Sequence, residues 1–171
     1  MKKVTLYTVM GLLILSGLTG CGKSPEMELT PISITVSDAA HGGDSRFYIL
    51  PPLVAEPAYS GVFDPDLSPT ISIPALNVEF TTEKIPGSEY IRVDEAEELY
   101  IVNWKTDTYD FEIPGVYRMS FYLGEVEIGY IEIEVFETPQ EVISQGDVIT
   151  TVIQPGRTIP IKFRIETERA R

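Results

Sequence analysis

The chain has few of the side chains on which nucleophilic catalysis usually depends. His41 is the single imidazole and Cys21 the single thiol, and no G-x-S-x-G motif occurs. A Ser-His-Asp triad would have to use His41, which lies in the Gly-flanked sequence DAAHGGDS, and that sequence is typical of an exposed loop. We therefore predict no catalytic residue and no enzyme activity. A transition-metal site built from several His or Cys side chains is excluded by their number.

Carboxylates are abundant, and they could form an acid–base pair or hold Ca²⁺ through oxygen ligands. The clearest candidates are Asp64 and Asp66 in VFDPDL, with Asp44 in another predicted loop. A calcium loop usually needs more ligands and a Gly-assisted bend, whereas Asp and Pro favour turns for local reasons. Calcium binding by Asp64 and Asp66 stays open at this point, with turn formation as the simpler interpretation. No metal site and no cofactor is predicted.

Two further acidic groups are predicted to be solvated. The sequence DEAEE at 94–98 is interpreted as a loop, and Glu125, Glu127, Glu132 and Glu134 as the wet face of a hairpin. Charge on that face would discourage edge-to-edge aggregation, and acids on an exposed sheet lack the cleft that raises one pKa.

Aromatic residues offer a different function, because they supply a large contact area at low entropy cost. Most of them are in phase with the apolar faces of predicted strands and belong to the core. Tyr48, Tyr59, Tyr109 and Tyr122 are the ones whose positions do not demand burial. They are our candidates for a patch that contacts a carbohydrate or a protein.

The single cysteine follows a short apolar segment. Lys2 and Lys3 precede a mostly apolar run from Val4 to Leu18, which is the layout of a secretory signal. A permanent membrane helix needs about 20 apolar residues. We therefore interpret this shorter run as a signal peptide that is cleaved off, and not as a helix that spans the membrane.

The letters LTGC at 18–21 resemble the lipobox of bacterial lipoproteins. The resemblance implies that the Cys21 thiol receives a diacylglycerol, that the chain is cut between Gly20 and Cys21, and that the new amino group is acylated. Two or three acyl chains, at about 0.8 kcal/mol per buried CH₂, would anchor the protein stably. Because Gly22 is not Asp, the resemblance favours the outer membrane if the source is Gram-negative.

Charge limits the partners of the mature chain. Removal of residues 1–20 takes away two of the 13 basic residues and none of the 26 acidic ones, so the balance becomes 11 minus 26, or -15. Such a chain repels nucleic acid and anionic headgroups, and no basic cluster in the sequence offsets this. We predict no nucleic-acid partner. The predicted partners are the membrane, through the lipid on Cys21, and an unidentified envelope protein or glycan.

The rest of the chain predicts β structure. Short runs rich in Ile, Val, Tyr, Phe and Thr recur between turn-forming residues, without an amphipathic helical stretch. Strands are predicted at 32–37, 46–50, 70–73, 76–82, 89–93, 99–105, 116–123, 126–136, 147–153 and 158–166. The predicted organisation is a signal peptide at 1–20, a lipidated N-terminus and spacer at 21–31, a β-sandwich at 32–168 and a tail at 169–171.

Two segments predict finer geometry. In YRMSFYLGEVEIGYIEIEVFE, Gly124 and Glu125 can turn a hairpin in two residues. The apolar face of its second strand then switches from even to odd positions, which predicts a β-bulge near Gly129. In TIPIKFRIE, odd-numbered residues 159–165 point inward and even-numbered ones outward, and Pro160 places this strand at an edge or near its own start.

The segment EIPGVYRMSF resembles the corner of immunoglobulin-like domains, where a Pro-Gly bend leads to a Tyr that hydrogen-bonds upstream backbone. Tyr117 would hold that role, and Trp104, alternating with Tyr100 and Val102, would be the core indole. The sequences RFYILPPLV, SGVFDPDLSP, ELYIVNWKTD and GRTIPIKFRIE resemble an uncharacterised module of secreted bacterial proteins, which implies an extracytoplasmic all-β fold and assigns no activity.

Together these patterns predict an all-β, immunoglobulin-like, mostly antiparallel β-sandwich. The predicted function is that of a cell-envelope lipoprotein with a non-catalytic binding or structural module, which acts through loops or through addition of a partner strand at an exposed edge. The alternative is a carbohydrate-binding or calcium-dependent adhesion module, and an enzyme ranks third.

Overall fold

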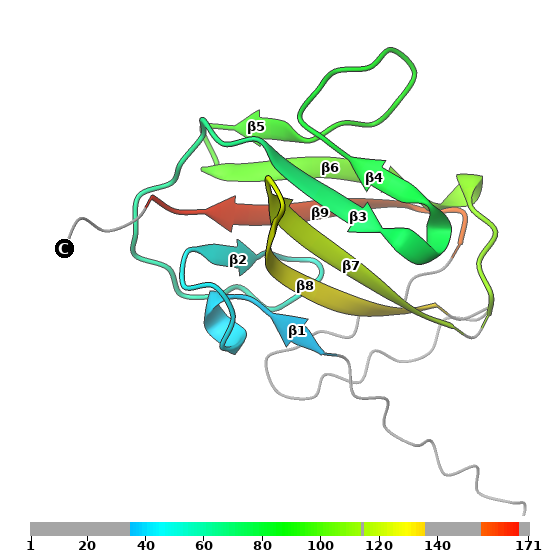
Figure 1. Cartoon of the computed structure of the whole chain (residues 1–171), viewed down its shortest axis with the longest axis horizontal. Helices are drawn as coiled ribbons and strands as arrows, with labels where there is room; N and C mark the ends of the chain where they lie inside the picture. The colour runs from blue at the N-terminus through cyan, green and yellow to red at the C-terminus, as the bar shows by residue number, and fades with distance from the viewer. Residues whose placement is uncertain (1–34, 114, 136–154, 168–171) are drawn as a thin grey trace, which may run out of the picture. The chain divides into compact units, whose positions relative to one another are not determined.

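The described part of the chain forms two antiparallel sheets (Figure 1). The computed structural model describes residues 35–113, 115–135 and 155–167. In these ranges the strands are β1 Val36–Ser37, β2 Phe47–Ile49, β3 Pro69–Ile73, β4 Val78–Phe80, β5 Arg92–Asp94, β6 Leu99–Lys105, β7 Gly115–Leu123, β8 Val126–Val135 and β9 Thr158–Ile165. Single 3₁₀ turns occur at Ala39–His41, Pro74–Leu76 and Thr106–Thr108.

The sheets have the strand orders β1-β8-β7-β3-β4 and β2-β9-β6-β5. Every strand pair is antiparallel, and the two sheets pack face to face, so the predicted all-β sandwich is confirmed. The finer immunoglobulin-like prediction is not confirmed, because such domains pair their strands as ABED and CFG and the order of the described strands is different. None of the helices within the described ranges is long and apolar enough to cross a membrane.

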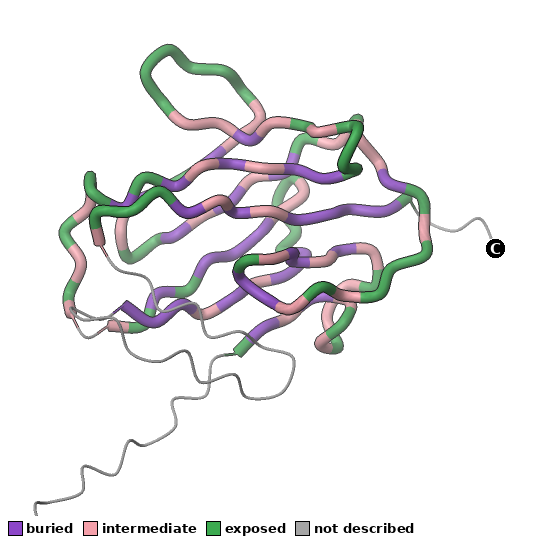
Figure 2. The backbone as a smooth tube through the Cα atoms, turned by 180° about the vertical axis from the view of Figure 1, so that it is seen from behind, coloured by how far each residue is buried: buried purple, intermediate pink, exposed green. Residues whose placement is uncertain are grey.

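Aromatic side chains join the sheets. The ring of Phe121 on β7 lies 4.9 Å from that of Phe47 on β2 and 5.2 Å from that of Phe163 on β9, measured between centroids. Trp104 is fully buried, as its alternation with Tyr100 and Val102 predicted. Buried and partly exposed residues alternate along the strands in Figure 2, which is the pattern expected where one face of each sheet is buried.

The bulge predicted near Gly129 is present. Gly129 pairs with Phe121, whereas Glu127 pairs with the next residue, Tyr122, so Ile128 is the extra residue. Ile128 itself is buried. After the bulge, the buried apolar residues of β8 occupy odd positions, beginning with Ile131. The register shift is therefore what keeps the apolar face inward along the whole strand.

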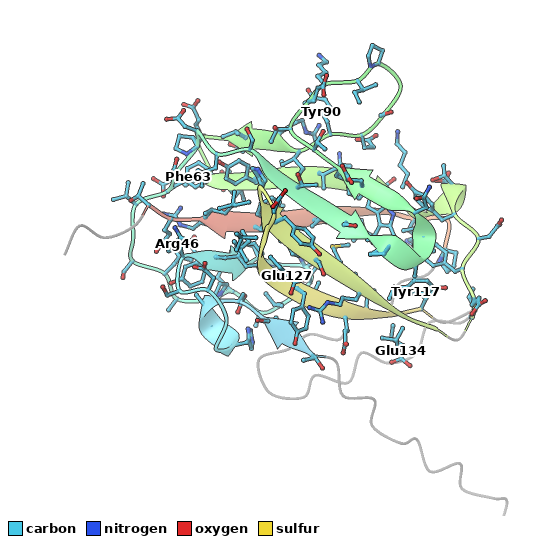
Figure 3. The ribbon with its side chains drawn as sticks, in the orientation of Figure 1. Arg46, Phe63, Tyr90, Tyr117, Glu127 and Glu134 are labelled. Atoms are coloured by element: carbon cyan, nitrogen blue, oxygen red, sulfur yellow. The ribbon has the colours of Figure 1, made fainter. Side chains whose placement is uncertain are left out.

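Tyr117 makes the corner contact that its motif predicted. Its hydroxyl accepts a hydrogen bond from the backbone N–H of Glu112 at 2.6 Å and donates one to the carbonyl oxygen of the same residue at 3.1 Å. The ring is buried against Phe111. Figure 3 places Tyr117 near the first residues of β7, so this contact ties the bend before β7 to the strand itself.

The predicted strand limits differ from the observed ones where local turns intervene. The run at 76–82 shortens to β4 because Pro74–Leu76 form a 3₁₀ turn and Asn77 adopts a φ of 52°. Pro160 lies in β9, which is an interior strand, but β2 pairs only with Phe163–Ile165. The proline therefore lies near the strand start, where β2 does not flank it. The predicted strand at 147–153, the segments 1–31 and 169–171, and Cys21 lie outside the described residues.

Candidate functional site

Two of the four candidate tyrosines come together on the outer face of the four-stranded sheet. The rings of Tyr48 and Tyr59 lie 5.9 Å apart between centroids, and we call this pair the tyrosine platform. Tyr48 points outward because its neighbours in β2, Phe47 and Ile49, are buried in the core. Tyr59 belongs to the segment before β3 and is 39% exposed. The platform is thus an accessible aromatic surface outside the core.

The other two candidate tyrosines do not join it. Tyr109 packs against the buried Trp104, with ring centroids 6.3 Å apart, and so belongs to the margin of the core. Tyr122 lies on β7 in the other sheet, where its hydroxyl contacts Glu127 at 3.5 Å.

Under Tyr59 lies a buried arginine. The Arg164 side chain is only 3% exposed, and its guanidinium carbon lies 4.5 Å from the centroid of the Tyr59 ring. The guanidinium donates hydrogen bonds to the carbonyl oxygen of Glu98 at 3.0 Å, to the Glu98 carboxylate at 2.8 Å, to the carbonyl oxygen of Gly61 at 3.1 Å and to Glu166 at 3.3 Å. We call these four residues the arginine cluster. Charge-assisted bonds of this kind are stronger than neutral ones, and they fix the cation beneath the ring.

The same cluster holds the segment that carries Tyr59. The Gly61 N–H donates to the Glu166 carboxylate at 2.9 Å, and the Thr167 N–H donates to the Val62 carbonyl oxygen at 2.9 Å. A Cβ atom on Gly61 would collide with the Glu166 carboxylate. The ring of Tyr59 is therefore positioned before any partner arrives, which lowers the entropy cost of a contact.

Alternation along β9 correctly predicted that Arg164 and Glu166 are on its outer face, but it did not predict their burial. Both are buried because residues 59–63, about a hundred positions earlier in the chain, cross this face. No local signal in the sequence around β9 points to that contact.

Basic residues continue along the same face. Lys162 pairs with Ile101 on β6, and Ile101 pairs with Arg92 on β5, so these three residues form one row across the sheet, which we call the basic row. Neither Lys162 nor Arg92 forms an ion pair with any described residue. The sequence contains no basic cluster, and the sheet creates one by bringing together positions that are 70 residues apart.

The carboxylates of two calcium candidates, Asp64 and Asp44, are engaged in a local turn and an ion pair. The Asp64 carboxylate accepts the Asp66 N–H at 3.2 Å, which is an Asx-turn. Asp44 instead binds the Arg46 guanidinium through both carboxylate oxygens, at 3.2 and 3.1 Å, and this hydrogen bonding lowers the pKa of Asp44. In the part of the chain that the structure describes, no three His, Cys, Asp or Glu side chains are grouped to hold a metal ion.

The turn at Asp64 is tied to the core by a tyrosine. The Tyr100 hydroxyl donates to the carbonyl oxygen of Asp64 at 2.6 Å and accepts the Leu67 N–H at 3.2 Å. Burial, with smaller contributions from the carboxylates of Asp64 and Asp66, raises the pKa of Tyr100 to about 12. The proton thus stays on the hydroxyl in its structural role at neutral pH.

His41 differs from the exposed loop histidine that its sequence predicted. It ends the 3₁₀ turn Ala39–His41, its side chain is 20% exposed, and its Nδ1 lies 2.6 Å from the carboxylate of the buried Asp38. Asp38 also accepts the N–H groups of His41 and of Ile49 on β2, both at 3.0 Å. The pair caps the turn and the edge of β2, and the exposure prediction for His41 was wrong because Asp38 draws the ring inward.

The acidic predictions hold in part. Residues 95–98 are exposed and form the turn between β5 and β6, in which the Asp94 carboxylate accepts the Glu97 N–H at 3.1 Å. On the hairpin, Glu125 and Glu127 are exposed, but Glu134 is buried. Burial raises the pKa of Glu134, so the prediction that this residue lies on the wet face was wrong.

Comparison with models of protein families, with curated proteins and with solved structures finds no match for this chain. The best-defined part of the candidate site is the tyrosine platform over the arginine cluster.

Proposed function

We propose that this chain is a lipid-anchored protein of the cell envelope whose β-sandwich is a non-catalytic binding module. The anchor is supported by the LTGC sequence, which makes Cys21 the first residue of the mature chain and the site of lipidation. The binding role is supported by one observation above all: the Tyr48 and Tyr59 rings lie together on the outer face, and Tyr59 rests on a buried arginine that donates four hydrogen bonds. The outer membrane is the proposed location if the source is Gram-negative.

A carbohydrate-binding module is the second candidate, and the flat rings of Tyr48 and Tyr59 favour it. A calcium-dependent adhesion module has less support, because Asp44 binds Arg46 and the Asp64 carboxylate closes its own turn.

The anchor gives the first test. When the full chain is produced in a Gram-negative host, we expect the mature N-terminus to be Cys21 carrying two or three acyl chains, and the protein to partition into detergent. Cys21→Ser should appear in the aqueous phase, whereas Ser24→Ala should behave as the parent. Mass spectrometry of the N-terminal peptide reads the modification directly, and an unmodified Cys21 or a retained Met1 would contradict the anchor.

The platform gives the second test. We expect Tyr59→Ala to weaken binding of the purified mature chain to envelope fractions by about 30-fold, since removing a central aromatic anchor typically costs about 2 kcal/mol. Tyr122→Ala, a tyrosine on the other sheet, is the matched control and should bind as the parent does. Binding is measured by co-sedimentation over a concentration series, and equal losses in the two variants would remove the platform from the proposal.

A further inference from the structure

We infer that the outer face of the four-stranded sheet binds an acidic polysaccharide. Its sugar rings stack on the tyrosine platform, and its carboxylates are bound by Lys162 and Arg92. The inference rests on the proposed binding function and names the chemical class of the partner.

The two contact zones lie within reach of one polymer chain. Tyr48 on β2 pairs with Arg164 on β9, and Lys162 precedes Arg164 by two residues on β9. The row that contains Tyr48 and the basic row are therefore about 7 Å apart along the strands. Across the sheet, Lys162 and Arg92 are separated by one strand, or about 10 Å between backbones. A ligand lying across the face therefore meets flat rings at one side and two cations farther along.

The charges on this face favour an anion locally. Two acids near this face are ion-paired: Glu98 binds Arg164, and Glu89 binds Lys105 at 2.6 Å. Asp94, two residues from Arg92, accepts only a backbone N–H, so the formal charges of Lys162, Arg92 and Asp94, 2 minus 1, leave one positive charge. The cations of the basic row have no such partner among the described residues. Because ionic screening limits interactions between exposed charges to about 8 Å at physiological salt, a local cationic row can attract an anion despite the net charge of the mature chain, 11 minus 26, or -15.

The edge beside the platform is closed to an added peptide strand. The backbones of Arg46 and Leu50 form hydrogen bonds with β9. Because successive residues of a strand face opposite sides, the N–H groups of Phe47 and Ile49 point away from β9. The first donates to the Asp44 carbonyl oxygen at 3.2 Å and the second to the Asp38 carboxylate at 3.0 Å. Strand addition needs free donors of this kind. A partner at the platform therefore lies over the sheet face, where the two rings offer a stacking surface for a sugar.

The test measures binding of the purified mature chain to polygalacturonate and alginate by affinity electrophoresis and calorimetry. We expect both polymers to bind, with affinity falling as salt is raised, and neutral dextran to bind at least tenfold more weakly. Tyr59→Ala and the double variant Lys162→Glu/Arg92→Glu should each lose at least tenfold. Lys84→Glu/Arg157→Glu, which reverses the same number of charges at exposed positions outside the strands, should bind as the parent does, and thermal melts confirm that each variant is folded.

The contrary outcomes separate this inference from the proposed function. Binding of polyglutamate as tightly as polygalacturonate would show a general polyanion surface and overturn the inference. Tyr59-dependent binding to neutral dextran, unaffected by the charge variants, would also overturn it while supporting a binding platform. If neither uronic acid polymer binds but Tyr59→Ala still impairs binding to envelope fractions, the inference fails and the proposed function stands.

Discussion

Gly129→Ala is expected to lower the free energy of unfolding by about 3 kcal/mol, at the upper end of the usual cost of overpacking a core. A Cβ atom at this position would overlap the Phe47 ring and the backbone carbonyl oxygen of Ser37. The ring cannot rotate away, because it is fully buried between Phe121 and Phe163. The carbonyl oxygen cannot retreat without separating β1 from β8. The loss is measured by urea unfolding followed by tryptophan fluorescence.

Gly124→Ala is the matched control for this substitution. Gly124 has a φ of 59° in the hairpin turn, and no atom lies within 4 Å of a Cβ built there. Its cost is the backbone strain of a left-handed residue, about 1 to 2 kcal/mol. A Gly129→Ala protein as stable as the parent, or a Gly124→Ala protein that loses more, would show that close approach at the bulge is not what requires glycine.

The bulge also shows why much of the fold follows from sequence. Side chains on a strand alternate with a period of two, so a change from even to odd apolar positions within one strand requires an extra residue. The same alternation predicted the limits of β6 and the burial of Trp104. Local turn chemistry was harder to predict: the 3₁₀ turn at Pro74–Leu76 shortened a predicted strand because Pro74 begins it and Asn77 ends it in a left-handed conformation.

The candidate site was less predictable, because its contacts join distant parts of the chain. The sequence identified Tyr48 and Tyr59 as tyrosines that the core does not require. It did not indicate that their rings would contact each other or that Arg164 would pack against the Tyr59 ring. Arg164 and Glu166 alternate with apolar residues, as solvated residues of a half-buried strand do. Their burial depends on the path of residues 59–63, and only the tertiary structure shows that path.

Arg164→Met tests whether this buried cluster holds the sandwich together. Methionine keeps an unbranched apolar stem, so the substitution removes the charge and the hydrogen bonds while retaining much of the packing. We expect the free energy of unfolding to fall by about 3 to 5 kcal/mol, the usual result of breaking a buried ion pair. The reason is that Glu166, itself only 7% exposed, is left in the interior without its cation.

Two further variants distinguish a lost charge partner from lost packing. Lys162→Met makes the same change two residues away on the same face, where no ion pair exists among the described residues, and it should stay within about 0.5 kcal/mol of the parent. In Arg164→Met/Glu166→Gln, the uncompensated carboxylate is also removed. If the unpaired charge of Glu166 causes the loss of stability, the double variant has a higher free energy of unfolding than the sum of the two single losses predicts. Strictly additive losses would instead mean that Arg164 stabilises the fold through contacts with Gly61, Glu98 and Tyr59, independently of Glu166.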